Sequence, residues 1–423
     1  MRDLSVGTWI GSLDEGPVWA PAPVVGGGLA IGQGTANRVV LVDDRTDAGT
    51  VAPIATWSDD ASSSFGAAVA VVPDVGGADA YDLWVGAPDS DFGKGAVHLF
   101  RTAELDVEVT TEAAELTLTG GTAGDQLGTS VVLCADLTGD RRPELIVTAP
   151  WFTSPSGGGL DGAVPRLAGA TFLLRSQDLQ GQTGRVSIWD LATTWYGGTS
   201  GEGAGQGVVC DRDLDGDGVV DVVVGAPWAD RGRGRIYVLS GGDVPSGRLD
   251  LVATSVIDGP TAGDMFGAAL ATLTVGAQEV LAVGAPGTAD GTGEVALYPG
   301  SELDGGTPRQ LLAFEGTART TADHFGRELL VGDLDGDGSD DLIVGAPDAH
   351  GTGRNDFDTG ALWIWTGATS DTWSARTAAV DADRLLDGDQ PFERIGARLA
   401  VADLDGDGQQ DLLVPTRAAD PAQ

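Results

Sequence analysis

The chain has 423 residues, of which 42% are hydrophobic and 21% are charged. That balance is typical of a folded globular protein, so a wholly disordered chain is excluded and a sizeable core can form. The formal net charge is −39, from 24 Lys+Arg against 63 Asp+Glu. A surface of this sign repels nucleic acids and anionic membranes, so nucleic-acid binding is excluded as a function.

The two cysteines, Cys134 and Cys210, are too few for a disulfide scaffold or a zinc cluster, and we expect both to be small buried hydrophobic residues. No stretch approaches the roughly 18 consecutive apolar residues of a membrane span. The first residues do not form a signal-peptide pattern. The chain is therefore either an intracellular protein or, as we expect, a mature or excised portion of an exported one, located outside the cell or at its surface.

A repeated unit organises the sequence. Each unit opens with an apolar residue and a glycine, and about twenty residues later an apolar run ends in Gly-Ala-Pro or a close variant. A third apolar run, headed by glycine, follows. These runs are short, often β-branched, and bounded by Gly, Pro and Asp, which predicts strands rather than helices. The opening glycines are Gly66, Gly128, Gly205, Gly267, Gly326 and Gly396.

A weaker fourth strand precedes each new unit, for example at 186–189 and 311–314. Four strands per unit of about 60 residues predict an all-β fold, a seven-bladed β-propeller of four-stranded blades that forms one domain over residues 1–423. The last unit has only two strands, so we expect residues 1–23, around Val6–Ile10, to pair with it and close the ring. The units start near residues 24, 65, 127, 204, 266, 325 and 395.

Three units carry the pattern Asp-x-Asp-x-Asp-Gly-x-x-Asp between their first and second strands. Carboxylates at positions 1, 3, 5 and 9 and the carbonyl at position 7 form an oxygen cage, and glycine at position 6 permits a positive φ. Calcium fits this cage better than magnesium, and the absence of His and Cys argues against zinc. An EF-hand needs a Glu at position 12, where these loops have Val, so we expect about three Ca²⁺ ions in β-hairpin loops. The expected ligands are Asp213, Asp215, Asp217, Val219 and Asp221; Asp333, Asp335, Asp337, Ser339 and Asp341; and Asp403, Asp405, Asp407, Gln409 and Asp411.

A fourth loop, residues 136–144, is a degenerate copy. It keeps oxygen-bearing side chains at positions 1, 3, 5 and 9 but has Arg141 where glycine belongs, so we expect weak metal binding or none.

The combination of Phe-Gly, the Asp loop and Gly-Ala-Pro in one repeat resembles the FG-GAP repeat of the integrin α-subunit propeller. The resemblance covers nearly the whole chain. It implies a seven-bladed propeller with calcium loops on the lower face and ligand contacts on the upper face. Recognisable leg domains are absent, so an integrin's partner subunit and signalling role do not follow from it.

Catalytic motifs are sparse. The three histidines are His98, in a predicted strand, and His324 and His350, in loops of one unit. No nucleophile elbow, zinc-protease motif or phosphate-binding loop is present. We therefore expect an adhesion or recognition propeller that is not an enzyme and has no catalytic residues. The alternatives are an extracellular hydrolase or lyase with a carboxylate site on one propeller face, and a sugar-binding lectin.

We expect the partner, a protein or a glycan, to bind the face opposite the calcium loops, because function accumulates on loops that are free to vary. The protein would be a monomer or part of a larger chain. Aromatic residues are common anchors in recognition sites. The aromatic candidates on these loops are Trp151, Phe152, Trp195, Tyr196, Trp228 and Phe357.

Overall fold

The computed structural model describes most of the repeat region. The described residues are 20–23, 29–33, 36–42, 55–59, 63–73, 81–101, 108–153, 166–242, 245–303, 312–315, 322–350, 358–367, 382–388, 392–403 and 409–414.

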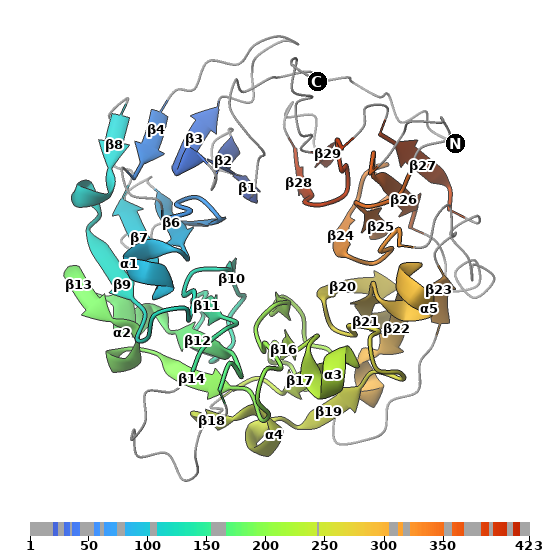
Figure 1. Cartoon of the computed structure of the whole chain (residues 1–423), viewed down its shortest axis with the longest axis horizontal. Coiled ribbons are helices and arrows are strands. Elements are labelled where there is room, and N and C mark those ends of the chain that lie inside the picture. The colour runs from blue at the N-terminus through green and yellow to red at the C-terminus, as the bar shows by residue number, and fades with distance from the viewer. Residues whose placement is uncertain are drawn as a thin grey trace.

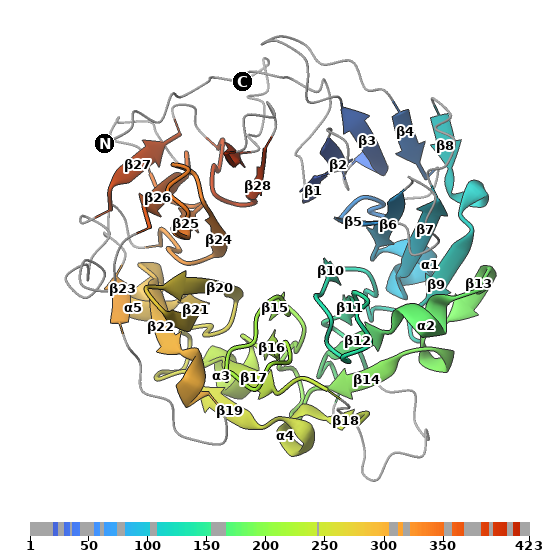
Figure 2. The same ribbon diagram turned by 180° about the vertical axis from the view of Figure 1, so that it is seen from behind.

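The fold is all-β, as predicted, with seven separate sheets among the described residues. The sheets stand side by side around a central axis (Figure 1), and the view from behind shows the same ring (Figure 2). In each sheet the first strand of the unit lies nearest the axis. These inner strands are β1 (Ala20–Pro23), β5 (Ala68–Pro73), β10 (Val131–Leu133), β15 (Val208–Val209), β20 (Ala269–Val275), β24 (Glu328–Gly332) and β28 (Ala400–Ala402).

The strands of each unit pair antiparallel in sequence order, from the axis outward. The second strands are β2 (Leu29–Gln33), β6 (Tyr81–Ala87), β11 (Leu145–Ala149), β16 (Val222–Gly225), β21 (Gln278–Ala285), β25 (Asp341–Ala346) and β29 (Asp411–Leu413). The third strands are β3 (Arg38–Val42), β7 (Ala96–Arg101), β12 (Ala170–Leu174), β17 (Arg235–Leu239), β22 (Glu294–Pro299) and β26 (Ala361–Trp365). The fourth strands are β4 (Ala55–Ser58), β9 (Leu116–Thr119), β14 (Thr193–Tyr196), β19 (Ser255–Asp258), β23 (Leu312–Glu315) and β27 (Arg384–Asp387).

Three sheets gain a fifth, parallel strand from the following unit: β8 (Glu108–Thr110), β13 (Gly184–Ser187) and β18 (Gly247–Arg248). Our prediction of a fourth strand at 186–189 is therefore wrong. The segment pairs with β9 of the preceding sheet, and β14 is the fourth strand of its own unit, because the long unit leaves enough chain to reach its neighbour's edge.

The helical segments are single turns: α1 (Ser90–Gly93), α2 (Ser176–Leu179), α3 (Ala229–Gly232), α4 (Leu249–Val252), α5 (Thr288–Gly291), η2 (Thr111–Ala113), η3 (Ile188–Asp190) and η4 (Gly300–Glu302).

The N-terminal segment differs from the expectation. Within residues 1–23, the described part Ala20–Pro23 is β1, which pairs antiparallel with β2 as the inner strand of the first sheet. It also lies against β28 of the last sheet, so the first and last described sheets are neighbours. Residues 1–19, with Val6–Ile10, lie outside the described residues, and their pairing stays a prediction.

The core lies between the sheets. Each main group of buried apolar side chains draws on two neighbouring sheets, so the second to sixth sheets bury both faces against their neighbours. The opening aromatic residue of a unit belongs to this core: Phe325 is fully buried, and its ring packs edge-on against Trp363 at a centroid distance of 5.3 Å. This packing explains why an apolar residue opens each unit.

Two glycines of the motif set how closely units approach. Gly267, which opens a unit, has a φ of 86° and donates its N–H to the carbonyl of Gly284 in the same unit. Its own carbonyl oxygen lies 2.1 Å from where a Cβ on Gly225 of the preceding unit would be. The opening glycine and the glycine of Gly-Ala-Pro therefore form the contact between adjacent units, and a side chain at Gly225 would obstruct it.

The connections fall on two faces. Loops that join inner strands to second strands lie on what we call the Asp-loop face. Loops that join second strands to third strands, and one unit to the next, lie on what we call the upper face. The upper-face turns α1, α3 and α5 lie in front of the strands in Figure 1.

Candidate metal centres and the opposite face

The Asp loop at residues 213–221 connects β15 to β16. The carboxylate of Asp213 accepts hydrogen bonds from the N–H groups of Gly216 and Gly218, at 2.7 Å each. Gly218, at position 6 of the motif, has a φ of 92°, which glycine adopts without strain. The first aspartate and the glycines thus fold the turn.

Asp221, at position 9, is the buried member of the loop, with 2% of its surface exposed. One carboxylate oxygen accepts the N–H groups of Leu214 at 2.8 Å and Asp215 at 3.2 Å, and the other accepts the N–H of Gly241 at 3.0 Å. Burial, with a smaller contribution from the charge of Asp215, raises the pKa of Asp221 to about 6 against the lowering effect of these hydrogen bonds. Ligand atoms of Asp213, Asp215 and Asp221 lie within 4.8 Å of one another.

The loop at residues 333–341, between β24 and β25, repeats this geometry. Asp333 accepts the N–H groups of Asp337 at 3.1 Å and Gly338 at 2.9 Å. Asp341 is fully buried, and burial raises its pKa to about 6. Asp333, Asp335 and Asp341 again bring ligand atoms within 4.8 Å of one another.

The fifth-position carboxylates lie differently from the other three. One oxygen of Asp217 accepts the N–H of Val219, and one oxygen of Asp337 accepts the N–H of Ser339, both at 2.8 Å. Neither aspartate belongs to the group of three that converges in its loop. In these two loops positions 1, 3 and 9 converge, while one oxygen of the position-5 carboxylate accepts a hydrogen bond within the turn.

The degenerate loop at residues 136–144 keeps the same shape. Asp136 accepts the N–H groups of Gly139, Asp140 and Arg141, and Arg141 adopts a φ of 68° where the other loops have glycine. Glu144 is buried, and burial raises its pKa. Asp136, Asp140 and Glu144 converge within 4.8 Å, with Glu144 at position 9. The sequence led us to expect weak binding or none, yet three carboxylates converge here too, with Asp140 at position 5 in place of the position-3 carboxylate of the other two loops.

The Asp loop at residues 403–411 is described only at its ends. Asp403, Gln409 and Asp411 are among the described residues, whereas Asp405 and Asp407 lie outside them. The adjacent side chain of Gln410 accepts the backbone N–H of Asp333 at 2.9 Å, which ties this loop to the preceding unit.

The donor chemistry fits a hard divalent cation. Each of the three described groups consists of carboxylates alone, with one member buried and with a raised pKa. Clustered carboxylates repel one another, and a divalent ion with oxygen preference removes that repulsion. The residues present therefore suit Ca²⁺ rather than a metal that prefers nitrogen or sulfur ligands.

The two cysteines are a correction to the sequence analysis. Cys134 and Cys210 form a disulfide with a Cα–Cα distance of 5.0 Å, although 76 residues separate them. They end the inner strands of neighbouring units, β10 and β15, where the N–H of Ala135 also donates to the carbonyl of Cys210 at 3.1 Å. The two cysteines meet because their strands are neighbours in the ring. The sequence held one signal for this: Cys134 lies two residues before Asp136 and Cys210 three residues before Asp213, so both occupy similar positions in their units.

Sequence reasoning also missed Arg212. Its guanidinium donates to Asp340 at 2.7 Å and to Glu279 at 3.1 Å, so it links three neighbouring units on the Asp-loop face. Beside it lies a cavity of 410 Å³. Its lining residues are Asp211, Arg212, Thr272, Val331, Gly332, Asp333, Asp340 and Gln410.

The aromatic candidates on the upper face divide into two groups. The buried group consists of Phe152, Trp195 and Tyr196. The ring of Phe152 packs on that of Trp189 at a centroid distance of 4.9 Å, and Trp195 and Tyr196 belong to strand β14, so these three are core residues and not ligand contacts. Trp228 is 40% exposed, and its ring lies 6.5 Å from that of the partly buried Trp151. Phe357 lies outside the described residues.

Two His–Asp pairs lie in the loops of the sixth unit. Nδ1 of His324 is 2.7 Å from one oxygen of Asp348, and Arg394 of the next unit donates to the other oxygen at 2.6 Å. His350 and Asp358 form the second pair, at 3.3 Å. Burial alone would raise the pKa of Asp348, but the bond with His324 and the charge of Arg394 bring it below its ordinary value.

The same framework occurs in the second unit with other side chains. Asp89 occupies the place of Asp348, next to Gly-Ala-Pro, and accepts hydrogen bonds from Ser64 at 2.5 Å and Gln126 at 3.1 Å. A hydrogen-bonded aspartate thus occupies this position in both units. The His–Asp–Arg combination is the particular feature of the sixth unit and its neighbour.

Comparison with known families decides what the repeat is. The FG-GAP repeat family matches residues 204–239 and 325–365, which cover Asp loops, glycine contacts and strands of the fourth and sixth units. The chain carries FG-GAP repeats. The prediction drawn from the motif is confirmed, and the chain is similar to integrin α subunits: integrin alpha-4 of Xenopus laevis is 27% identical over 276 residues, or 62% of this chain and 23% of that protein.

A second group of FG-GAP relatives bears the name of an enzyme. Phosphatidylinositol-glycan-specific phospholipase D is 35% identical in Rattus norvegicus, over 35% of this chain and 19% of that protein. The protein of the same name in Bos taurus is 30% identical, over 44% of this chain and 23% of that protein. The chain thus matches about a fifth of the length of these curated relatives. Their names contradict our prediction that the protein is not an enzyme.

No helix among the described residues is long and apolar enough to cross a bilayer.

Proposed function

We propose that this chain is a calcium-stabilised, closed seven-bladed FG-GAP propeller that serves an extracellular hydrolase. The seven described sheets share one strand order, and the contact between β1 and β28 supports a closed ring in one domain. The buried Cys134–Cys210 disulfide supports an oxidising, extracellular location, because such bonds are rare in reducing compartments.

The calcium part of the proposal assigns the ligands by loop. In the fourth unit these are the carboxylates of Asp213, Asp215, Asp217 and Asp221 with the carbonyl of Val219. The corresponding residues of loops 333–341 and 403–411 hold the second and third ions, and loop 136–144 is a weaker site. A bound ion neutralises the clustered carboxylates and stabilises the folded loop.

Calcium titration tests this part. We expect about three ions per chain by isothermal titration, and each independent site should add roughly 2.7 kcal/mol at a hundredfold excess over its dissociation constant. Asp217→Ala should remove part of that gain. A melting temperature that is the same in calcium and in chelator contradicts the assignment.

The hydrolase part is carried by the 35% identity to relatives named as a phospholipase D. The chemistry available on the upper face supports it. With its Nδ1–H donated to Asp348, His324 would present its second ring nitrogen as a general base, and Arg394 would bind an anionic ester oxygen. The proposed reaction is hydrolysis of a phosphodiester: a water molecule loses one proton to His324 as its oxygen bonds to phosphorus, the ester P–O bond breaks, and the alcohol leaves with the proton that His324 took up.

The experiment measures phosphate-ester hydrolysis by the purified chain, on a soluble phosphodiester and on a phosphatidylinositol-glycan. His324→Gln and Asp348→Asn should lower kcat at least about a hundredfold. Asp89→Asn, the equivalent bridge of the second unit, is the matched control and should leave kcat unchanged. Activity that survives His324→Gln, or no hydrolysis of either substrate in calcium, contradicts this part.

A second candidate function is recognition of a protein or glycan ligand on the upper face, as a monomer or within a larger chain. Similarity to integrin alpha-4 over 62% of the chain favours it. The exposed side chain of Trp228 beside Trp151 is the candidate anchor. Protein and glycan arrays test this function, and Trp228→Ala should then weaken binding while the calcium-dependent melting shift stays intact.

A further inference from the structure

The exposed large hydrophobic side chains are unevenly distributed over the described residues. Phe92, Trp228 and Phe392 are 90%, 40% and 50% exposed and lie in upper-face loops, with the exposed Leu167 in another. The other exposed ones, Leu251, Val256 and Leu385, belong to α4, β19 and β27 at the outer rim of the ring (Figure 1). The described part of the Asp-loop face contributes none.

The backbone around Phe92 belongs to the repeat, but the side chain does not. The turns α1, α3 and α5 each contain two consecutive residues with left-handed φ, and the second of them is Phe92, Arg231 or Asp290. The fold therefore accepts an aromatic, a cation or an anion at this tip. A left-handed φ of 59° is unfavourable for phenylalanine, and the ring gains no burial in the folded chain. Phe392 combines a φ of 64° with exposure in the same way.

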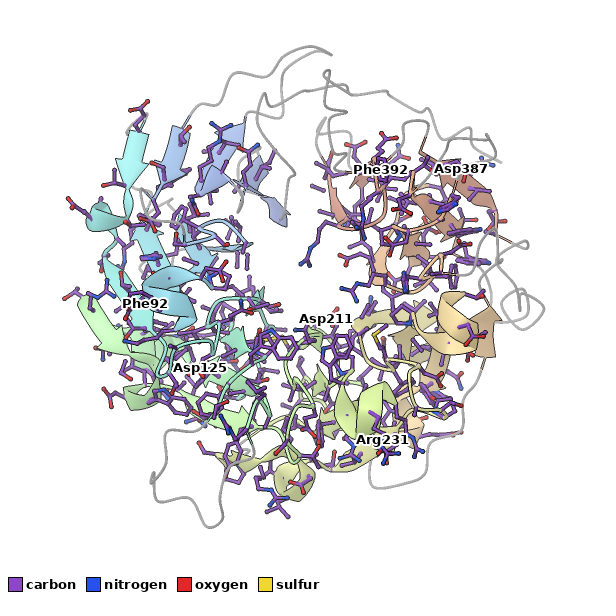
Figure 3. All side chains as sticks on the ribbon, in the orientation of Figure 1. Phe92, Asp125, Asp211, Arg231, Asp387 and Phe392 are labelled. Atoms are coloured by element: carbon purple, nitrogen blue, oxygen red, sulfur yellow. A yellow bond between two sulfur atoms is a disulfide. The ribbon has the colours of Figure 1, made fainter. Side chains whose placement is uncertain are left out.

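The arrangement of these tips points to a flat partner. Figure 3 shows Phe92 at the left of the ring, Phe392 at the upper right and Arg231 at the lower right, so the tips are separate points and not one contiguous patch. The cavity beside Arg212 lies on the other face. A lipid surface accepts such separated apolar tips, whereas a single protein partner would need a matching pocket at each.

Basic residues accompany the exposed aromatics: Lys94 follows Phe92 by two residues, Arg231 and Arg233 follow Trp228, and Arg394 follows Phe392. Three of them form ion pairs, Lys94 with Asp91, Arg233 with Asp230 and Arg394 with Asp348, so these tips carry both signs of charge. Aromatic side chains flanked by Lys or Arg are enriched at the boundary between lipid headgroups and acyl chains. A net charge of −39 opposes approach to an anionic bilayer, so the surface that fits is zwitterionic.

We propose that the upper face docks on a zwitterionic lipid surface, with the side chains of Phe92, Trp228 and Phe392 entering the headgroup region. The inference rests on the proposed function in one respect, the use of the upper face, and names what that face contacts. It needs neither bound calcium nor hydrolysis.

Vesicle sedimentation tests the proposal. The full chain is mixed with phosphatidylcholine vesicles, and the bound fraction is measured for the wild type and for Phe92→Ser/Phe392→Ser. We expect roughly a tenfold weaker partition for this variant, because two apolar insertions are lost. The rim variant Leu251→Ser/Leu385→Ser removes as many exposed apolar side chains and should bind like the wild type. Trp228→Phe should reduce quenching of tryptophan fluorescence by brominated lipid.

Four results overturn the proposal: no binding to phosphatidylcholine, an equal loss in the rim variant, stronger binding to phosphatidylserine vesicles, or binding of the upper face to a protein receptor without binding to vesicles. The calcium-dependent melting shift and hydrolysis of the soluble phosphodiester are measured on the same variants. Their failure contradicts the proposed function, whereas failed sedimentation with both intact contradicts only the lipid contact.

Discussion

Replacement of Gly225 by alanine tests the contact between adjacent units. The new Cβ would lie 2.1 Å from the carbonyl oxygen of Gly267, well inside van der Waals contact, and a backbone atom cannot rotate away as a side chain would. Overpacking of this kind costs about 3 kcal/mol, and the loss of chain entropy in the unfolded state returns up to about 1 kcal/mol. We therefore expect the free energy of unfolding to fall by about 2 kcal/mol and the melting temperature by about 2 °C.

Gly207→Ala is the matched control. Its Cβ would also face the Gly267 carbonyl oxygen, but at 3.3 Å, which a small shift accommodates. We expect its free energy of unfolding to stay within about 0.5 kcal/mol of the wild type. Urea denaturation in saturating calcium measures both variants. If Gly225→Ala is as stable as Gly207→Ala, the close approach of the two glycines does not limit the packing of units.

Three further predictions concern calcium, pH and the disulfide. Asp341→Asn should lower calcium affinity in titration calorimetry more than Asp337→Asn does, because only Asp341 belongs to the converging group; equal losses would contradict the geometry of the loop. Burial lowers the pKa of His98 to about 4, so the folded protein holds it neutral, and stability should fall by up to about 3 kcal/mol as pH drops from about 6.5 to 4. In denaturant titrations across that range, the His98→Leu variant should lose less stability at low pH than the wild type. The same pH dependence in both proteins would refute the assignment to His98. Cys134→Ala/Cys210→Ala should cost about 4 kcal/mol of unfolding free energy, because a long loop is no longer closed in the unfolded chain; two free thiols in the unreduced wild type would show that the bond does not form.

The sequence alone determined those features whose residues are close together in the chain. The strands follow from short apolar runs between turn residues, and β25 (Asp341–Ala346) and β26 (Ala361–Trp365) lie where those runs predicted them. The Asp loops follow from nine consecutive residues, in which Asp213 and Gly218 shape the turn by contacts across five positions. Local turn chemistry of this kind is readable because the interacting groups are fixed by their spacing.

The tertiary structure decided which distant segments meet. The Cys134–Cys210 bond spans 76 residues and exists because neighbouring inner strands end side by side at the axis. The segment at β13 (Gly184–Ser187) reads as a strand in the sequence, but the free edge of the preceding sheet decides its partner. Likewise, Trp195 and Trp228 are both aromatic residues near upper-face loops, and only the packing of sheets buries the first and leaves the second exposed. Such choices depend on the positions of whole sheets around the ring, which no local spacing encodes.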